Sequence, residues 1–278
     1  MTNLTDLDVP PTQSGVPSLE SLGHDLTETT NVQRRLAIIR PFAAVMLFVL
    51  ACWAGWWWLT PVAVFLVFVA VVAVTHDVVH NNLGLSPRQT EWALFATGAL
   101  LLESGHAYRT THLRHHAVFP GPDDPEGDPA PMSFWRSILH GPVFLPKLWW
   151  WAWRKQRRNR PQRAWLAAEA LFAIGIILFS LIATQWTYGP IVYGVLAWTG
   201  SWVYPLLTVH LPHRHYGDSP LSQTHTLRGK LIPALFLELT YHLEHHLYPQ
   251  VPSHHLPELS KRLTPFFEQA RVEPRRVP

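Results

Sequence analysis

Three groups of histidines recur at helical spacing, and they are the residues best suited to do chemistry. In the pattern H-x-x-H-H, histidines at positions i, i+3 and i+4 share one face of a helix, and in H-x-x-x-H two histidines lie one turn apart. Imidazole is the commonest side-chain ligand of transition metals. Eight imidazoles can fill more than one coordination sphere, so the sequence predicts a site for two metal ions. The eight are His76 and His80, then His112, His115 and His116, and last His242, His245 and His246.

Histidines at these spacings also occur in other classes of protein. A single H-x-x-H-H could be a surface helix, but two copies and an H-x-x-x-H, each beside apolar sequence, argue against that. A metal transporter is a further class, and it predicts ionisable residues within its spans. No charged residue occurs from Pro41 to Thr75. A haem-binding membrane protein would show a strong Soret band after purification, which a haem-free pair of metals would not.

The composition indicates a membrane protein. Hydrophobic residues make up 48% of the chain and charged residues 15%, against about 25% charged in a typical soluble domain. The 14 tryptophans suit membrane–water interfaces. The single cysteine, Cys52, excludes a disulfide framework and a cysteine-ligated metal site. The basic residues behind the net charge of +3 flank apolar segments, so we interpret them as topology signals and contacts to anionic lipid or an acidic partner. We expect no nucleic-acid partner.

Four apolar segments are expected to cross the bilayer and to position the histidines. The uncharged stretch from Pro41 to Thr75 has about 35 residues, enough for two short crossings. Trp56 to Pro61 fits a turn between them, because aromatic residues favour the interface and proline ends a helix. The expected spans are Pro41–Leu59, Pro61–His80, Leu166–Thr184 and Ile191–Val209.

Charge places these spans relative to the two sides of the membrane. The loops within each pair of spans carry no charge, whereas the basic run Arg154–Arg160 lies on the other side. By the positive-inside rule, both termini and all three histidine groups are then cytoplasmic. The predicted fold class is an all-α, multi-pass integral membrane protein with four transmembrane helices and a cytoplasmic helical cap that carries the three histidine groups.

The remaining segments are expected to lie at or outside the membrane. Trp92–Leu102 is too short to span and predicts an interfacial or re-entrant segment. Phe134–Trp153, interrupted by Pro142 and Pro146, predicts a partly embedded amphipathic segment. The expected organisation is a flexible cytoplasmic tail over residues 1–33, a membrane catalytic domain over residues 34–270 that ends in a short helix at about 257–269, and a loose C-terminal tail over residues 271–278.

Acidic residues near the histidines could orient the imidazoles by accepting their N–H groups. The candidates are Asp77, Asp124 and Glu244. Asp124 lies in the loop Phe119–Pro129, whose prolines and glycines argue against a helix. The acids of this loop could bond to ligands or to neighbouring arginines such as Arg109 and Arg114. The plainer interpretation of the loop is a solvated acidic surface.

A ninth histidine would complete a nitrogen-only site for two metals. The segment His210-Leu211-Pro212-His213 follows the fourth expected span, and its residues alone leave His210 and His213 as equal candidates. His225 lies in an expected loop and is a weaker candidate. The other histidines are expected to be ordinary polar or interfacial residues: His24, His106, His140, His254 and His255.

The histidine groups, in this order around four expected spans, resemble those of the membrane fatty acid desaturase and hydroxylase superfamily. The resemblance covers roughly His76–Asp128 and Tyr204–Leu263. Leu211-Pro212-His213-Arg214 resembles the L-P-H-R element of bacterial β-carotene ketolases, and Asp123-Asp124-Pro125 also looks like their loop. These features point to the carotenoid branch. Glu244–Pro249 is similar to both carotene hydroxylases and acyl desaturases. The first group has three intervening residues and departs from the acyl-CoA desaturase pattern of four.

The resemblance implies a centre of two iron ions on the cytoplasmic side that reacts with O2. It implies that all eight histidines of the three groups are ligands. The L-P-H-R match adds His213, with His210 in reserve. With no fused cytochrome domain in the sequence, the expected electron donor is a separate protein such as ferredoxin. The implied protein is a non-haem di-iron oxygenase of a bacterial inner membrane.

The expected reaction is the O2-dependent oxidation of a C–H bond in a lipid-soluble substrate. The first hypothesis is hydroxylation or ketolation of the β-ionone ring of a carotenoid such as β-carotene. Hydroxylation is favoured, since the sequence beyond the L-P-H-R element is not a close ketolase match. The alternative is an acyl-lipid (fatty acid) desaturase with the same metal centre. Either substrate would need a dry apolar channel between the helices.

Overall fold

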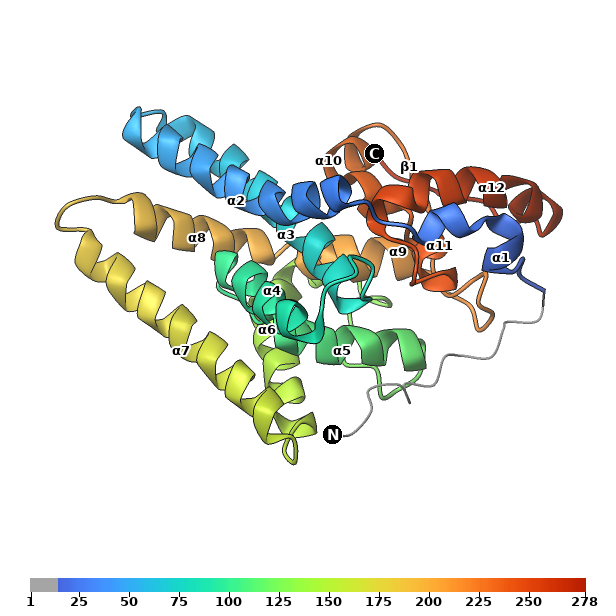
Figure 1. The fold of residues 1–278 in the computed structure, drawn as a ribbon, viewed down its shortest axis with the longest axis horizontal. Coiled ribbons are helices and arrows are strands. Elements are labelled where there is room, and N and C mark those ends of the chain that lie inside the picture. The colour runs from blue at the N-terminus through green and yellow to red at the C-terminus, as the bar shows by residue number, and fades with distance from the viewer. Residues whose placement is uncertain (1–14) are drawn as a thin grey trace.

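The computed structural model describes residues 15–278, and helices form nearly all of its regular structure (Figure 1). The longest are α2 (Asn31–Trp53), α3 (Thr60–Val79), α6 (Phe134–Lys155) and α7 (Arg160–Ala183). The two strands described, β1 (Leu227–Arg228) and β2 (Arg275–Arg276), form a short parallel pair. The predicted all-helical class is confirmed.

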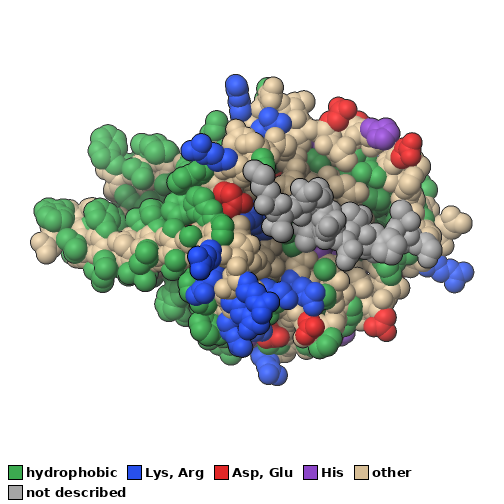
Figure 2. All heavy atoms as spheres, turned by 60° about the horizontal axis from the view of Figure 1, so that its bottom comes forward, with side chains coloured by type: hydrophobic (Ala, Val, Ile, Leu, Met, Phe, Trp, Pro, Cys, Tyr) green, Lys and Arg blue, Asp and Glu red, His purple; other side chains and the backbone are tan. Residues whose placement is uncertain are grey.

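Two helical hairpins extend to the left in Figure 1, and their tips are the two charge-free loops. One hairpin joins α2 to α3 through the short 3₁₀ helix η2 (Trp57–Leu59), and the other joins α7 to α8 (Gly189–Ser201). Apolar side chains such as Leu171, which is 69% exposed, cover their outer surfaces, and Figure 2 shows hydrophobic side chains along both arms. Apolar surface of this extent is expected to face lipid.

Helix α3 is the centre of the fold. Of the residues in the most apolar part of α3, 83% are buried, whereas the corresponding share is 22% for α2 and 28% for α7. A helix that is apolar on every side belongs inside a protein or membrane bundle. In α3 the buried valines include Val67, Val71 and Val72. The C-terminal turn of this central helix carries His76.

Three helical segments are long and apolar enough to cross a membrane, as far as the described residues go, and they contain α2, α3 and α7. The first begins earlier than the expected Pro41, because Thr30 and Gln33 form a capping box that starts α2 at Asn31. The fourth expected span, Ile191–Val209, is not a single helix. Its α8 ends at Ser201 after 13 residues, about 20 Å of helix, whereas the hydrocarbon core is about 30 Å thick.

A π-helix follows α8 and leads to the ninth histidine. After a turn at residues 202–203, the π-helix η3 (Leu206–His210) passes into a single α-helical turn, α9 (Leu211–His213). π-Helical turns are rare and often occur at functional sites. His210 is the last residue of the π-helix, and His213 is the last residue of the α-helical turn that follows it.

Helices α4 (Pro87–Leu100), α5 (Gly105–Val118) and α6 pack against the two hairpins, and α5 carries His112, His115 and His116. α6 is continuous from Phe134 to Lys155, with Pro142 and Pro146 inside it, whereas the sequence predicted interruptions there. Packing overrides the local preference: a Cβ on Gly141 would lie 2.3 Å from Trp202 Cα, so the two backbones pass in direct contact.

Both ends of the described chain pack against the histidine-bearing part. Of the tail expected over residues 1–33, residues 1–14 lie outside the described residues, and the rest forms α1 (Leu19–Leu22), η1 (His24–Thr27) and the start of α2. Asp25 accepts two hydrogen bonds from Arg262 of α12 (Leu256–Gln269). Residues 271–278, expected to be loose, are held by backbone bonds, because β2 pairs with β1 and Leu231 N–H donates to Pro278.

Candidate metal centre

Four helical pieces bring nine imidazoles together. α3 and its C-cap contribute two, α5 contributes three, α9 one and α11 (His242–Leu247) three. The nitrogens form two groups, and within each group all lie within 4.8 Å of one another. The first group is His76, His80, His112, His116 and His245; the second is His115, His213, His242 and His246.

Short contacts between Nε2 atoms link the first group. His245 Nε2 lies 2.9 Å from both His76 Nε2 and His116 Nε2. His116 Nε2 in turn lies 3.2 Å from His112 Nε2. Nitrogens bound at about 2.1 Å to one metal and at right angles to each other are separated by about 3.0 Å. The spacing therefore matches neighbouring ligands of one ion.

The second group has the same spacing. His213 Nε2 lies 3.2 Å from His115 Nε2 and 3.0 Å from His242 Nε2. His242 Nε2 lies 3.2 Å from His246 Nε2. Helix α5 supplies ligand atoms to both groups, as does α11, because neighbouring residues of each H-x-x-H-H point to different groups. Because α5 and α11 each contribute to both groups, these two helices fix the position of one group relative to the other.

The hydrogen bonds on the far side of the rings indicate a cation between them. A neutral imidazole has one N–H. His115 Nδ1 lies 2.7 Å from Asp124 Oδ2, and His213 Nδ1 lies 3.0 Å from the Gln223 carbonyl. Each Nδ1 therefore carries the hydrogen, and the two Nε2 atoms that face each other carry lone pairs. Such lone pairs repel at 3.2 Å unless a metal ion or a proton lies between them, so the donor set fits a metal.

Burial keeps most of these rings in the form that binds metals. It lowers the pKa values of His112, His116, His242, His245 and His246 well below the usual range, and neighbouring imidazoles add to the effect. A neutral imidazole has the free lone pair that coordination requires. The rings are therefore prepared for a metal without having to lose a proton first.

Two carboxylates of the acidic loop orient rings of α5. Burial lowers the pKa of His115, but the hydrogen bond from His115 Nδ1 to Asp124 Oδ2, together with the charges of Asp124 and Glu126, outweighs burial, so that this pKa is raised. Glu126 Oε2 lies 3.3 Å from His112 Nδ1. Both carboxylates are buried, so the interpretation of this loop as a solvated surface was wrong for them, whereas Asp123 and Asp128 are exposed. Carboxylates behind ligating histidines fix the tautomer and increase the basicity of the ring.

Glu126 was covered only by the general expectation for the acids of its loop and was not singled out, and two acids that were singled out have other partners. Glu126 lies two residues after Asp124, but no spacing rule selects it. Asp77 Oδ1 accepts from the backbone and hydroxyl of Ser253. Glu244 accepts from Thr226 and Ser260. Asp77 thus braces α3 against η5 (Ser253–His255), and Glu244 braces α11 against Thr226 and α12, instead of orienting imidazoles.

The structure separates His210 from His213. His213 belongs to the second group, whereas His210 lies in the π-helix and its Nδ1 lies 3.1 Å from the Pro129 carbonyl. His225 is outside both groups, as are His24, His140, His254 and His255. His106 is less ordinary than expected: it is fully buried between Glu169 at 2.7 Å and Glu91 at 3.1 Å, and it ties α4, α5 and α7 together.

Replacing Asp124 by asparagine is expected to weaken the site. The amide can still accept from His115, but it no longer supplies the negative charge that makes the ring a stronger ligand. Losses of about 10- to 100-fold in metal affinity are typical of such changes. Metal titration of the purified variant measures this loss. The matched control is Asp123→Asn, since Asp123 is exposed and pairs with Arg114 at 3.4 Å; equal losses in both variants would contradict the role of Asp124.

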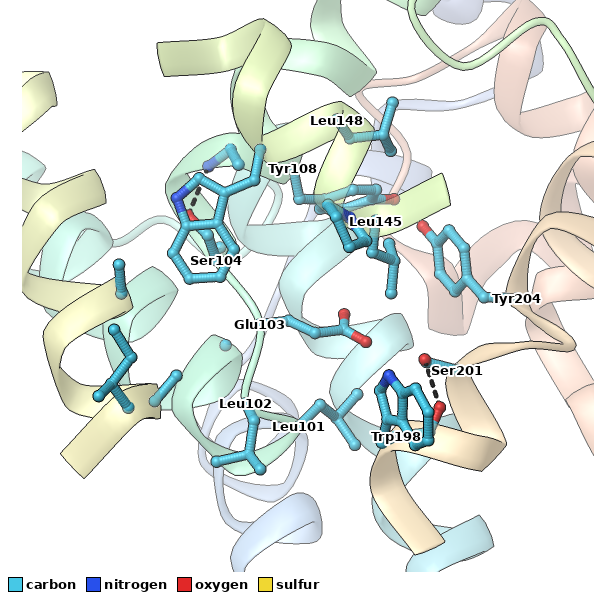
Figure 3. Close-up of a pocket in the computed structure, with 18 of the residues that line it drawn as sticks. Leu101, Leu102, Glu103, Ser104, Tyr108, Leu145, Leu148, Trp198, Ser201 and Tyr204 are labelled. Carbon is cyan, nitrogen blue, oxygen red and sulfur yellow. Dashed lines mark hydrogen bonds between the residues drawn. The ribbon is translucent and has the colours of Figure 1, made fainter. Parts of the chain in front are cut away.

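Two adjoining spaces lead to the histidines. A narrow cleft beside them is lined by His76, His112, His115, His242 and His245 and by apolar side chains. A cavity of about 980 Å³ lies among α3 to α8, and its lining is mostly apolar (Figure 3). Val72, Tyr108 and Tyr204 line both. These three side chains lie between the cavity and the cleft, so an elongated apolar molecule in the cavity has to pass the two tyrosines to reach the histidines.

Comparison with known proteins shows which family the chain belongs to. The family model described as fatty acid desaturase matches residues 55–277, which covers all nine histidines. Dihydrorhizobitoxine desaturase of Bradyrhizobium elkanii is 25% identical over 266 residues, which cover 80% of this chain and 72% of the relative.

Proposed function

Because the chain belongs to the fatty acid desaturase family, we propose that its nine clustered histidines hold two iron ions, and that the protein uses O2 to oxidise a C–H bond of a lipid-soluble substrate. The observation that carries the proposal is the pair of imidazole groups whose Nε2 atoms face one another at 2.9–3.2 Å. Iron bound there would supply the activation of dioxygen and the removal of hydrogen from carbon.

The protein's own residues have three tasks in this proposal. The imidazoles, with Asp124 and Glu126 behind two of them, hold the irons in fixed positions. The apolar walls of the narrow cleft exclude water from the reacting carbon. The cavity presents one part of the substrate to the cleft, so its shape selects the carbon that is oxidised.

The proposed location is a cell membrane, with the histidines and both termini on the cytoplasmic side. α2, α3 and α7 are crossings, and α8 with the segment up to Val209 is proposed as the fourth. The exposed basic residues between α6 and α7 include Arg157 and Arg158, and Figure 2 shows Lys and Arg side chains gathered beside the apolar arms. A basic surface there suits an acidic electron donor such as ferredoxin.

Two substrate classes fit the site. The first is a carotenoid, oxidised at its β-ionone ring to an alcohol or a ketone; the wide apolar cavity and the Leu211–Arg214 element support it. The second is an acyl lipid, in which loss of two hydrogens gives a double bond; the similarity to a protein named as a desaturase supports this one. Both use the same metal centre and differ in the product.

Product identification tests the proposal. We expect expression in a β-carotene-producing bacterium, with an active ferredoxin and reductase, to give hydroxylated or ketolated carotenoids on chromatography. A new double bond in the host membrane lipids would support the acyl-lipid alternative. Unchanged carotenoids and lipids, or purified protein without about two irons per chain, would contradict the proposal.

A further inference from the structure

One carboxyl group, that of Glu103, points into the large apolar cavity. It comes from the connection between α4 and α5, and its side chain extends toward Tyr204, Ser201 and Trp198 (Figure 3). Its Oε1 is buried and has no hydrogen-bond partner among the described residues. An unpaired buried carboxyl normally costs free energy, so its presence in a ligand-sized cavity indicates a partner from outside the protein.

The backbone holds this carboxyl in place. Leu102, just before it, has φ of 59°, a left-handed conformation that is unusual for a bulky residue. The two flanking helices meet so closely that a Cβ on Gly105 would lie 2.2 Å from the Leu94 carbonyl oxygen. Next to it, the Ser104 hydroxyl donates to Glu169 of α7. The connection thus directs the Glu103 carboxyl inward, while the neighbouring Ser104 hydroxyl is held by α7.

The charge state of Glu103 limits the kinds of functional group that it can bind. Burial raises its pKa to about 8, so it is neutral at pH 7 and can both donate and accept a hydrogen bond. Among the described residues that line the cavity, the other titratable groups are Tyr108 and Tyr204, and Lys, Arg and His are absent. The surroundings therefore favour a neutral polar group over a charged one.

We propose that Glu103 is a polar anchor of the substrate cavity and selects lipid-soluble molecules that carry a neutral oxygen, such as a hydroxyl, ether or carbonyl group. This inference rests on the proposed function. The anchored oxygen lies in the large cavity, while the apolar remainder extends past Tyr108 and Tyr204 to the histidines. The distance from oxygen to the oxidised carbon is then fixed by the protein. Acyl lipids and carotenoids that are already oxygenated at one ring carry such an oxygen, whereas β-carotene would enter the cavity without this hydrogen bond and bind more weakly.

Binding of three matched probes to the full-length purified protein tests the anchor. Retinol can donate and accept, its methyl ether can only accept, and deoxyretinol has no oxygen. At pH 7 we expect the wild type to bind the first two about tenfold more tightly than deoxyretinol, the value of one hydrogen bond in a buried site. Glu103→Leu should bind all three equally. Glu103→Gln should keep the preference, because an amide donates and accepts.

A pH arm remains informative if Glu103→Leu does not fold. Above about pH 8 the wild-type carboxyl ionises and can only accept a hydrogen bond. At pH 9.5 the methyl ether should therefore bind no more tightly than deoxyretinol, whereas retinol, which can donate, should still bind more tightly. In Glu103→Gln both preferences should persist at pH 9.5. Gly194→Trp tests whether the probes bind in the cavity. A Cβ at Gly194 meets only Leu102 at 3.8 Å, so an indole fits there and fills part of the cavity. This variant should bind all three probes more weakly.

Three results would overturn the anchor: no preference in the wild type, a preference that survives Glu103→Leu, or binding unaffected by Gly194→Trp. Because binding is measured without turnover, the two proposals can fail separately. A Glu103-dependent preference without any oxidised product in cells would contradict the proposed reaction alone. Oxidation of lipids in cells without a probe preference would contradict the anchor alone.

Discussion

Replacing His245 by alanine should abolish oxidation and remove metal from the first group. His245 Nε2 lies 2.9 Å from both His76 Nε2 and His116 Nε2, so its loss takes away the ligand that joins α11 to α3 and α5. Removing a partner behind a ligand already costs about 10- to 100-fold, so losing the ligand itself should lower turnover by more than about 100-fold. The iron content should fall from about two per chain toward one.

The measurements are iron analysis and product yield in the same membranes, with the amount of protein determined by immunoblot. His254→Ala is the matched control, because His254 follows α11 but belongs to neither imidazole group; it should retain iron and activity. Near-normal turnover of His245→Ala would show that this side chain holds no metal. An inactive His254→Ala would show that the site extends beyond the two groups.

The second large effect is expected for His213→Ala, which is compared with His210→Ala. His213→Ala should lose iron from the second group and fall below detectable activity, since His213 Nε2 lies within 3.2 Å of ligand atoms from both α5 and α11. His210→Ala should keep two irons, because its ring bonds to the Pro129 carbonyl and lies outside both groups. Its cost should be one buried hydrogen bond, about 1 kcal/mol of stability.

Comparing the two variants distinguishes a histidine that binds metal, His213, from a nearby histidine that does not, His210. Spectroscopy of the oxidised iron and iron analysis read the metal directly, and thermal unfolding in detergent reads stability. Loss of iron in His210→Ala with retention in His213→Ala would reverse the assignment. Equal loss of iron in both variants would show that the segment matters through its folding and not through one ring.

Much of the site was visible in the sequence because helical spacing is a local property. Histidines at i, i+3 and i+4 share a helix face whatever surrounds them, so the spacing alone was enough to group His112, His115 and His116. The apolar lengths that gave α3 and α7 are equally local. The start of α2 was predicted too late, since the weight given to Pro41 obscured the capping box at Thr30.

Features that depend on contacts between distant segments were not visible. The L-P-H-R resemblance favoured His213, but its place in the second group depends on how α9 packs, with the His213 ring bonded to the Gln223 carbonyl. The role of Glu126 depends on how the acidic loop folds back over α5. Nothing in the sequence marked Glu103, because an acid at the end of an apolar stretch is ordinary until a cavity forms around it.

The sequence by itself determined the residue types, the helical class and the three histidine groups, because composition and periodicity act over one or two turns. Only the tertiary structure decided how nine rings divide into two groups, which carboxylates lie behind them and which acid faces the cavity. Those outcomes depend on distances between segments as far apart as His76 and His245, and such distances arise only when α3, α5, α9 and α11 pack together.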